Sequence, residues 1–175
     1  LGYLLPTRER IMSGQQGTKP IINLACYAEE LGYDSIWIGD SITAKPRHDA
    51  LIILAGIAAV TDRIELGTAV LLPMLRNPVL LAHQVATLDQ VSEGRLILGV
   101  GTARDVPAIR KEFEAVGVPF EKRIGRMFEG IHLAKALWRA VPVTWSGRWI
   151  PNSVAIVPLP FLDCGPPLWC VGAAY

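Results

Sequence analysis

Five short runs of apolar residues divide the chain, and each has the length of a single strand. They begin near Gly2, Asp34, Leu66, Leu96 and Pro167. The first four starts lie about thirty residues apart, which is enough for a strand, a helix and two connections. Because right-handed crossovers return each strand to the same direction, this repeat predicts a parallel sheet with helices between its strands.

Between these runs, apolar residues recur at helical spacing, and local signals mark the helix ends. Pro20 suits a first helical turn, Asp49 is typical of an N-cap, and Asn77-Pro78 opens a third helix. Gly32 and Gly94 are typical of helix ends. The apolar residues that define the four predicted helices are Ile21, Leu24, Ala25, Ala28 and Leu31; Leu51, Leu54, Ala55 and Ala58; Leu81, Val85 and Leu88; and Ile124, Met127, Phe128, Ile131, Leu137 and Trp138.

Two α/β architectures use such repeats, the doubly wound open sheet and the (βα)8 barrel. The open sheet normally carries GxGxxG after its first strand, whereas here the first run continues into PTRER, which favours the barrel. We therefore predict an α/β chain of the (βα)8 TIM-barrel type that holds the first four βα units and a fifth strand. Residues 1–175 are expected to form one partial barrel domain, with an ordered insertion at about 140–166.

Composition narrows the class of protein. Hydrophobic residues make up 51% of the chain and charged residues 19%, which is typical of a soluble α/β protein with buried strands. The net charge is only +1 and the basic residues are scattered, so we expect neither a nucleic-acid nor a membrane partner. No apolar stretch has the length of a membrane span, and the first residues lack the pattern of a signal peptide. We expect a cytoplasmic protein.

The three cysteines and three histidines give no sign of a disulfide framework or a metal site. Cys26, Cys164 and Cys170 are odd in number and lack CxxC spacing, so we expect reduced, mostly buried thiols. The histidines are too dispersed for a zinc motif, and no metal is expected.

Several segments together resemble the bacterial luciferase-like flavin and deazaflavin oxidoreductases. They are AEELGYDSIWIGDS, AAVTDRIELGTAVLLP, RNPVLLAHQVATLDQVSEGRLILGVG and VGVPFEKRIGRMFEGIHLAKALW, in the family's order and spacing. The resemblance runs from about residue 2 through the PPLWCVG run and covers the amino-terminal half of such enzymes. It implies a (βα)8 barrel, a homodimer, and FMN or an 8-hydroxy-5-deazaflavin coenzyme that acts on a small organic substrate.

The resemblance also implies that the cofactor ring lies at the carboxyl ends of the strands, as barrel active sites do. A non-proline cis peptide bond that bulges beneath the ring would fall at Ala69-Val70. The residues expected to contact the cofactor are Asp40, Ser41, Thr68, Ala69, Val70, Leu72, Thr102, Ala103 and Arg104, with Pro6 and Thr7 as further candidates.

Asp40 and Arg104 each allow two readings. Asp40 could bind a ring N–H or orient a substrate, or it could cap the following turn. Family members that oxidise sugar phosphates carry an acid–base histidine at the position of Ser41 and a catalytic glutamate at the position of Arg104. Because both are replaced in this chain, the oxidation of sugar phosphates is not expected here. Arg104 could hold an anionic substrate or the cofactor's phosphate chain, or it could be a solvated surface residue. No catalytic residue is assigned.

Other charged motifs are expected to be structural. Asp89, Ser92, Glu93, Gly94 and Arg95 lie where a helix leads into a strand, which in a barrel is the stability face. Gly99 and Gly101 are expected to allow close packing at the barrel mouth rather than to cradle a phosphate. In the last helix, we expect an i, i+3 ion pair among Arg123, Arg126 and Glu129.

The chain supplies four of the eight βα units of a barrel and a fifth strand, with 175 residues against the roughly 250 that a complete barrel typically needs. Three hypotheses remain open: an incomplete version of a longer enzyme, two copies that pair edge to edge, and a non-catalytic flavin-binding or vestigial half-barrel. An open half-barrel would also expose two strand edges and an apolar face.

Overall fold

The structure, a computed structural model, describes residues 1–171. All five predicted strands are present, and Gly172, at the end of the last predicted run, lies outside the described residues. The elements in chain order are β1 (Gly2–Leu4), α1 (Thr7–Met12), α2 (Lys19–Glu30), β2 (Ser35–Ile38), α3 (Ala50–Ala58), β3 (Glu65–Thr68), a 3₁₀ turn (Pro73–Leu75), α4 (Pro78–Val91), β4 (Leu96–Gly101), α5 (Pro107–Ala115), a second 3₁₀ turn (Phe120–Lys122), α6 (Arg123–Leu137) and β5 (Leu168–Val171).

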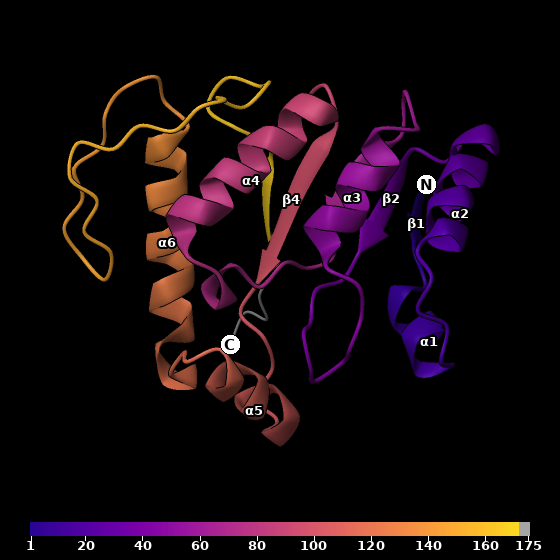
Figure 1. Ribbon diagram of the computed structural model, residues 1–175, viewed down its shortest axis with the longest axis horizontal. Coiled ribbons are helices and arrows are strands. Elements are labelled where there is room, and N and C mark those ends of the chain that lie inside the picture. Colours follow the sequence, from indigo (N-terminus) through magenta and orange to yellow (C-terminus); the bar gives the residue numbers. More distant parts are fainter. Residues whose placement is uncertain (172–175) are drawn as a thin grey trace.

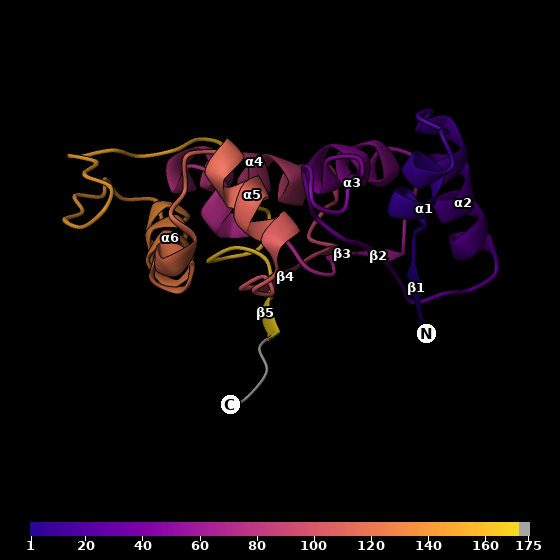
Figure 2. The same ribbon diagram turned by 90° about the horizontal axis from the view of Figure 1, so that it is seen from below.

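The strands form one parallel sheet in the order β1-β2-β3-β4-β5 (Figure 1). The large helices α2, α3, α4 and α6 all lie on the same face of the sheet, as Figure 2 shows. A doubly wound sheet would reverse its strand order and carry helices on both faces. Sequential order with one covered face is instead the arrangement of consecutive βα units in a barrel wall. The predicted partial barrel is confirmed.

The predicted helix starts are confirmed by their caps. The Oδ1 atom of Asp49 accepts hydrogen bonds from the N–H groups of Leu51 and Ile52, at 2.9 and 3.1 Å. Asn77 caps α4 in the same way, with Pro78 as the first helical residue. These side chains satisfy N–H groups that have no partner within the helix.

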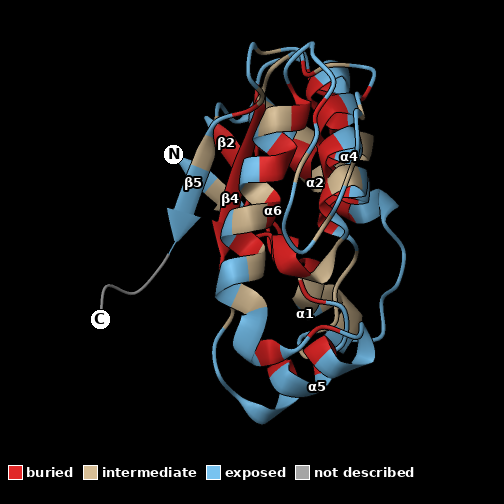
Figure 3. Ribbon diagram, turned by 90° about the vertical axis from the view of Figure 1, so that its left-hand side faces the viewer, coloured by how far each residue is buried: buried red, intermediate tan, exposed pale blue. Residues whose placement is uncertain are grey.

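The core lies between the sheet and its helices (Figure 3). All six residues of β4 are buried, whereas β5 is the more exposed edge strand. The residues predicted to define α2, α3 and α4 are buried or half-buried, with one exception. Leu31 is exposed, because it lies past the last residue of α2, where the chain turns through Gly32.

The stretch between α4 and β4 is scaffold, as predicted. The Arg95 guanidinium donates to the carbonyl oxygens of Ser92, Ile64 and Ala58 and to the hydroxyl of Thr61. Asp89 is fully buried and accepts a hydrogen bond from the N–H of Leu162, at 3.0 Å. The hydrogen bonds of Arg95 connect the amino ends of β3 and β4 to α3. The hydrogen bond of Asp89 connects α4 to the insertion at about 140–166.

Two predictions about side chains are wrong. Cys164 and Cys170 are exposed, because one lies in a turn and the other on the edge strand β5. The expected ion pair within α6 does not form, because Glu129 pairs with Arg148 of the insertion. Arg123 and Arg126 instead lie over the rings of Phe120 and Trp149.

Asn77→Ala removes the cap of α4 and should lower the free energy of unfolding by about 1 kcal/mol. Asn77→Asp keeps an oxygen acceptor at the same place and serves as the matched control. Urea unfolding followed by circular dichroism measures the difference. Equal losses in both variants would contradict the capping role.

Burial raises the pKa of Asp89 above its ordinary value of 3.8, against the hydrogen bonds from Leu162 and Phe161, which lower it. The folded protein therefore holds this proton more tightly than the unfolded chain, and stability should fall as the pH rises above about 4. Asp89→Asn should remove that part of the pH dependence while keeping an acceptor for the Leu162 N–H. Unfolding curves of both proteins between pH 4 and 7 test this, and parallel curves would refute it.

Candidate functional site

A pocket of about 510 Å³ opens at the carboxyl ends of β2, β3 and β4. Seven of the nine residues predicted to contact a cofactor line it: Asp40, Ser41, Ala69, Val70, Leu72, Ala103 and Arg104. Thr68 and Thr102 do not, and neither do Pro6 and Thr7. The sequence-based prediction thus converges on one place, at the end of the sheet where barrel enzymes carry their sites.

The floor of the pocket is the segment after β3. The Ala69-Val70 peptide bond is cis, at the position that the resemblance implies. The N–H of Ala69 donates to the carbonyl oxygen of Ile38 at 2.7 Å, and the N–H of Leu71 donates to that of Gly99 at 2.8 Å. These bonds hold the segment between its two neighbouring strands.

Two glycines of β4 allow this segment to lie so close. A Cβ atom on Gly99 would collide with the carbonyl oxygen of Thr68, and one on Gly101 would lie 2.6 Å from Cγ2 of Val70. Real Cβ atoms do not approach so closely, so larger residues would displace the floor. The predicted close packing at the mouth is confirmed.

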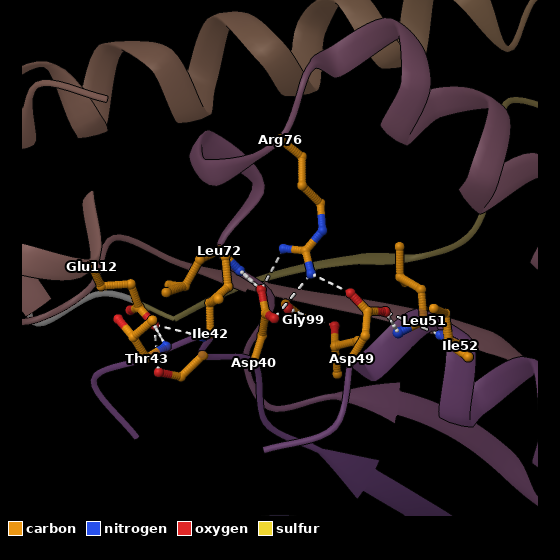
Figure 4. A network of polar contacts seen from close by, with 12 residues as sticks. Asp40, Ile42, Thr43, Asp49, Leu51, Ile52, Leu72, Arg76, Gly99 and Glu112 are labelled. Carbon is orange, nitrogen blue, oxygen red and sulfur yellow. Dashed lines mark hydrogen bonds and ion pairs between the residues drawn. The ribbon is translucent and has the colours of Figure 1, made fainter. Parts of the chain in front are cut away.

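Asp40 forms a buried ion pair rather than a free acid. Its carboxylate receives two hydrogen bonds from Arg76, at 2.6 and 3.0 Å, and one from the N–H of Leu72, at 3.0 Å (Figure 4). The Arg76 guanidinium also contacts Asp49, the N-cap of α3. Burial alone would lower the pKa of Arg76, but the hydrogen bonds and charges of Asp40 and Asp49 raise it overall. Neither reading of Asp40 as a ring ligand or a simple turn cap describes this network.

Ser41 belongs to a second network, centred on the buried Glu112 of α5. Oε1 of Glu112 accepts hydrogen bonds from the Ser41 hydroxyl at 2.7 Å, from the N–H of Ile42 at 2.5 Å and from the N–H of Thr43 at 2.8 Å (Figure 4). The Ser41 oxygen in turn accepts from the N–H of Lys45 at 2.9 Å. Glu112 therefore fastens the loop after β2 to the helix after β4.

The remaining predicted residues support the pocket from outside its lining. The buried Thr68 hydroxyl donates to the carbonyl oxygen of Gly99 at 2.7 Å. The carbonyl oxygen of Thr102 accepts a hydrogen bond from Arg123 at 3.0 Å. Ala103, by contrast, lines the pocket, and its positive φ of 64° turns the chain out of β4.

Sequence reasoning missed four charged residues at or beside the pocket: Lys45, Arg47, Arg76 and Glu112. Lys45 and Arg47 line it, but they lie in a loop without a motif. Arg76 and Glu112 are separated from their partners by many residues, so no local pattern reveals the pairs. The capping pattern at Asp49 was the one available signal that this region is ordered. Residues 1–171 bring together no group of His, Cys, Asp and Glu side chains that could hold a metal ion.

Comparison with known proteins agrees with the fold. The family profile described as luciferase-like monooxygenase matches residues 1–174. The chain belongs to this family. It is 40% identical over 138 residues to an F420-dependent glucose-6-phosphate dehydrogenase of Kineococcus radiotolerans, a match that covers 74% of this chain and 40% of the relative.

Solved structures show the same architecture. A monooxygenase, RslO1 from Streptomyces bottropensis, superposes with a TM-score of 0.85 at 27% identity, over 98% of this chain and 53% of that one. An F420-dependent secondary alcohol dehydrogenase, at 22% identity and a TM-score of 0.79, shares the fold over 98% of this chain and 51% of its own. The chain spans about half the length of the proteins it matches.

Arg76→Met should lower the free energy of unfolding by about 3 kcal/mol, because it leaves the Asp40 carboxylate buried without its cation. The double variant Asp40→Asn/Arg76→Met removes both charges and should recover part of this loss. Chemical denaturation of the wild type, both single variants and the double variant gives the coupling energy. Purely additive losses would show that the pair does not act as a unit.

Proposed function

We propose that the pocket at the carboxyl ends of β2 to β4 binds the ring of F420, a deazaflavin, or of FMN. On this proposal the protein is a luciferase-like oxidoreductase that uses the reduced cofactor on a small organic substrate. The observation that carries the proposal is the floor at Ala69 and Val70, presented to the pocket by the close approach of β3 to β4. The dependence of the named relatives on F420 favours the deazaflavin.

The residues present suit a flat heteroaromatic ring. Ala69 is exposed, Val70 half-buried and Leu72 buried, so the floor offers apolar atoms beside exposed backbone. Binding sites for cofactors are typically apolar clefts with a few polar groups that fix orientation. When bound, the cofactor would supply hydride transfer or oxygen activation, and the protein would bind and orient it.

The polar residues of the pocket position the site rather than move protons. Asp40 is engaged by Arg76 and by the Leu72 N–H, and the Ser41 hydroxyl donates to Glu112. Ser41 and Arg104 stand where sugar-phosphate oxidisers of the family carry a histidine and a glutamate. We therefore propose a substrate class other than a sugar oxidised through that acid–base pair, and we assign no general acid.

We also propose that the protein is a cytoplasmic homodimer. A groove of about 560 Å³ runs between the outer sides of α3 and α4 and is lined largely by apolar side chains. Ile52 and Leu80 are exposed there, at 72% and 54%. Such a continuous apolar surface suits a second copy of the chain. Within residues 1–171, no helix has the length and apolar character that crossing a membrane requires.

Ala69→Phe places a ring in the pocket and should weaken binding of F420 and FMN at least tenfold, because it occupies the space above the floor. Ala59→Phe, an exposed position after α3 at the other end of the sheet, is the matched control and should bind as the wild type does. Fluorescence titration with each cofactor measures the affinities.

Two outcomes would count against the proposal. If the wild-type chain binds neither cofactor, the pocket is not a flavin or deazaflavin site. If Ala69→Phe binds as tightly as Ala59→Phe, the cofactor lies elsewhere. Cofactor binding without substrate-dependent oxidation or reduction in the longest form of the protein would favour the non-catalytic alternative.

A further inference from the structure

The pocket contains cationic side chains that have no carboxylate partner. Lys45, Arg47 and Arg104 line it, and none of them lies within 4.0 Å of a carboxylate oxygen among the described residues. Most other arginines near the ends of the strands are engaged. Arg76 binds Asp40, Arg110 binds Asp105 and Glu121, and Arg95 binds three carbonyl oxygens.

Arg47 is the most informative of the three, because it is half-buried and its guanidinium lies against the backbone of Gly39. A Cβ atom on Gly39 would collide with its guanidinium and would lie 3.3 Å from the carbonyl oxygen of Ala69. The guanidinium therefore rests against bare backbone beside the Ala69-Val70 bond. Its one hydrogen bond within residues 1–171 is a long one of 3.4 Å, from Nε to the carbonyl oxygen of Lys45.

Two of the three acidic residues near Arg47, Asp40 and Glu112, are already engaged by other partners. Burial has the largest influence on the pKa of Arg47 and lowers it below its ordinary value. The charges of Glu9, Asp40 and Glu112 raise this pKa, and the charge of Arg8 lowers it. Asp40 is engaged by Arg76, and Glu112 accepts four hydrogen bonds from residues 41–44. Neither lies within ion-pair distance of Arg47.

The loop that carries Lys45 and Arg47 is held in place before any ligand arrives. Its amino end is fastened by Glu112, as described above, and its carboxyl end leads into the cap residue Asp49, which contacts Arg76. Two fixed ends reduce the entropy that the loop would lose on binding a ligand. An arginine with free N–H groups is suited to paired hydrogen bonds with carboxylate or phosphate oxygens.

We infer that Lys45, Arg47 and Arg104 form a subsite for the anionic group, a carboxylate or a phosphate, of the substrate that reacts at this pocket. This inference rests on the proposed function, and it deepens it by naming the substrate class. The apolar floor would hold the cofactor ring, and the cations would hold the substrate's anionic end beside it.

The first test measures anion binding without cofactor. Inorganic phosphate and succinate are titrated into the full chain, and ¹⁵N-edited spectra follow the arginine Nε–H signals. The inference predicts saturable shifts of the Arg47 and Arg104 signals and a marked weakening of binding as ionic strength rises. Arg47→Gln should weaken binding of the probes at least fivefold. Lys135→Gln, an exposed cation near the far end of α6, removes the same charge and should change it less than twofold.

A second variant tests whether anion binding depends on the position of the Arg47 guanidinium rather than on the total positive charge of the protein. Gly39→Ala keeps every cation, but its methyl group would displace the Arg47 guanidinium. It should weaken anion binding in the same direction as Arg47→Gln while the thermal unfolding midpoint shows that the chain is folded. Wild-type anion affinity in both Arg47→Gln and Gly39→Ala would overturn the inference.

The third test separates a substrate anion from the phosphate of the cofactor. FMN and riboflavin share one ring and differ by the phosphate, so their affinities are compared in wild type and Arg47→Gln. The inference predicts the same ratio of affinities in both proteins. A selective loss of FMN binding in Arg47→Gln would assign the cations to the cofactor and refute the substrate assignment. Failure of F420, FMN and riboflavin all to bind the wild type, with anion binding retained, would refute the proposed function instead.

Discussion

The buried ion pair between Asp40 and Arg76 is the interaction on which the carboxyl end of the sheet depends. Asp40 follows β2, and Arg76 follows the 3₁₀ turn after β3, so one contact joins two strand ends. The same guanidinium contacts Asp49, which caps α3, and the same carboxylate binds the N–H of Leu72 at the pocket. Removing either charge would leave the other desolvated, so these loops are energetically coupled.

Around this ion pair, the backbone shapes the pocket as much as the side chains do. Gly99 and Gly101 let β4 approach the segment after β3, and the hydrogen bonds of Ala69 and Leu71 fix that segment between its neighbours. The floor of the pocket is thus set by the sheet itself. The loops after β2 and β4 supply the charged residues, and Glu112 of α5 fastens the loop after β2 to that helix.

The fold could be predicted from local patterns in the sequence, and the place of the site was implied by the resemblance to the luciferase-like family. Short runs of residues, such as Asn77-Pro78 and the glycines of β4, indicate the strands, the helix caps and the repeat of βα units. The ion pairs could not be predicted in the same way. Arg76 lies 36 residues from Asp40, and Glu112 lies 71 residues from Ser41, so only the folded sheet brings them together. The pairing of Glu129 with Arg148 rather than within α6 has the same cause.

The role of Asp40 shows the limit of reading a residue by its position alone. Its place after a strand is compatible with a ring ligand, a substrate ligand or a turn cap, but its carboxylate pairs with Arg76, a contact that its position did not predict. The cations at the pocket could not be singled out in the sequence either, because Lys45 and Arg47 belong to no motif. They stand out only in the fold, where neither has a carboxylate partner within the described residues. Electrostatic features of this kind depend on the whole set of neighbours.

The central claim is that the cofactor ring binds at the carboxyl ends of β2 to β4. Backbone amide spectra of the chain, recorded with increasing F420 and separately with FMN, test it most directly. The account predicts that the largest shifts fall in residues 69–72 and 101–104, with smaller ones in the loop after β2. No shift with either cofactor, or shifts confined to the groove between α3 and α4, would contradict it.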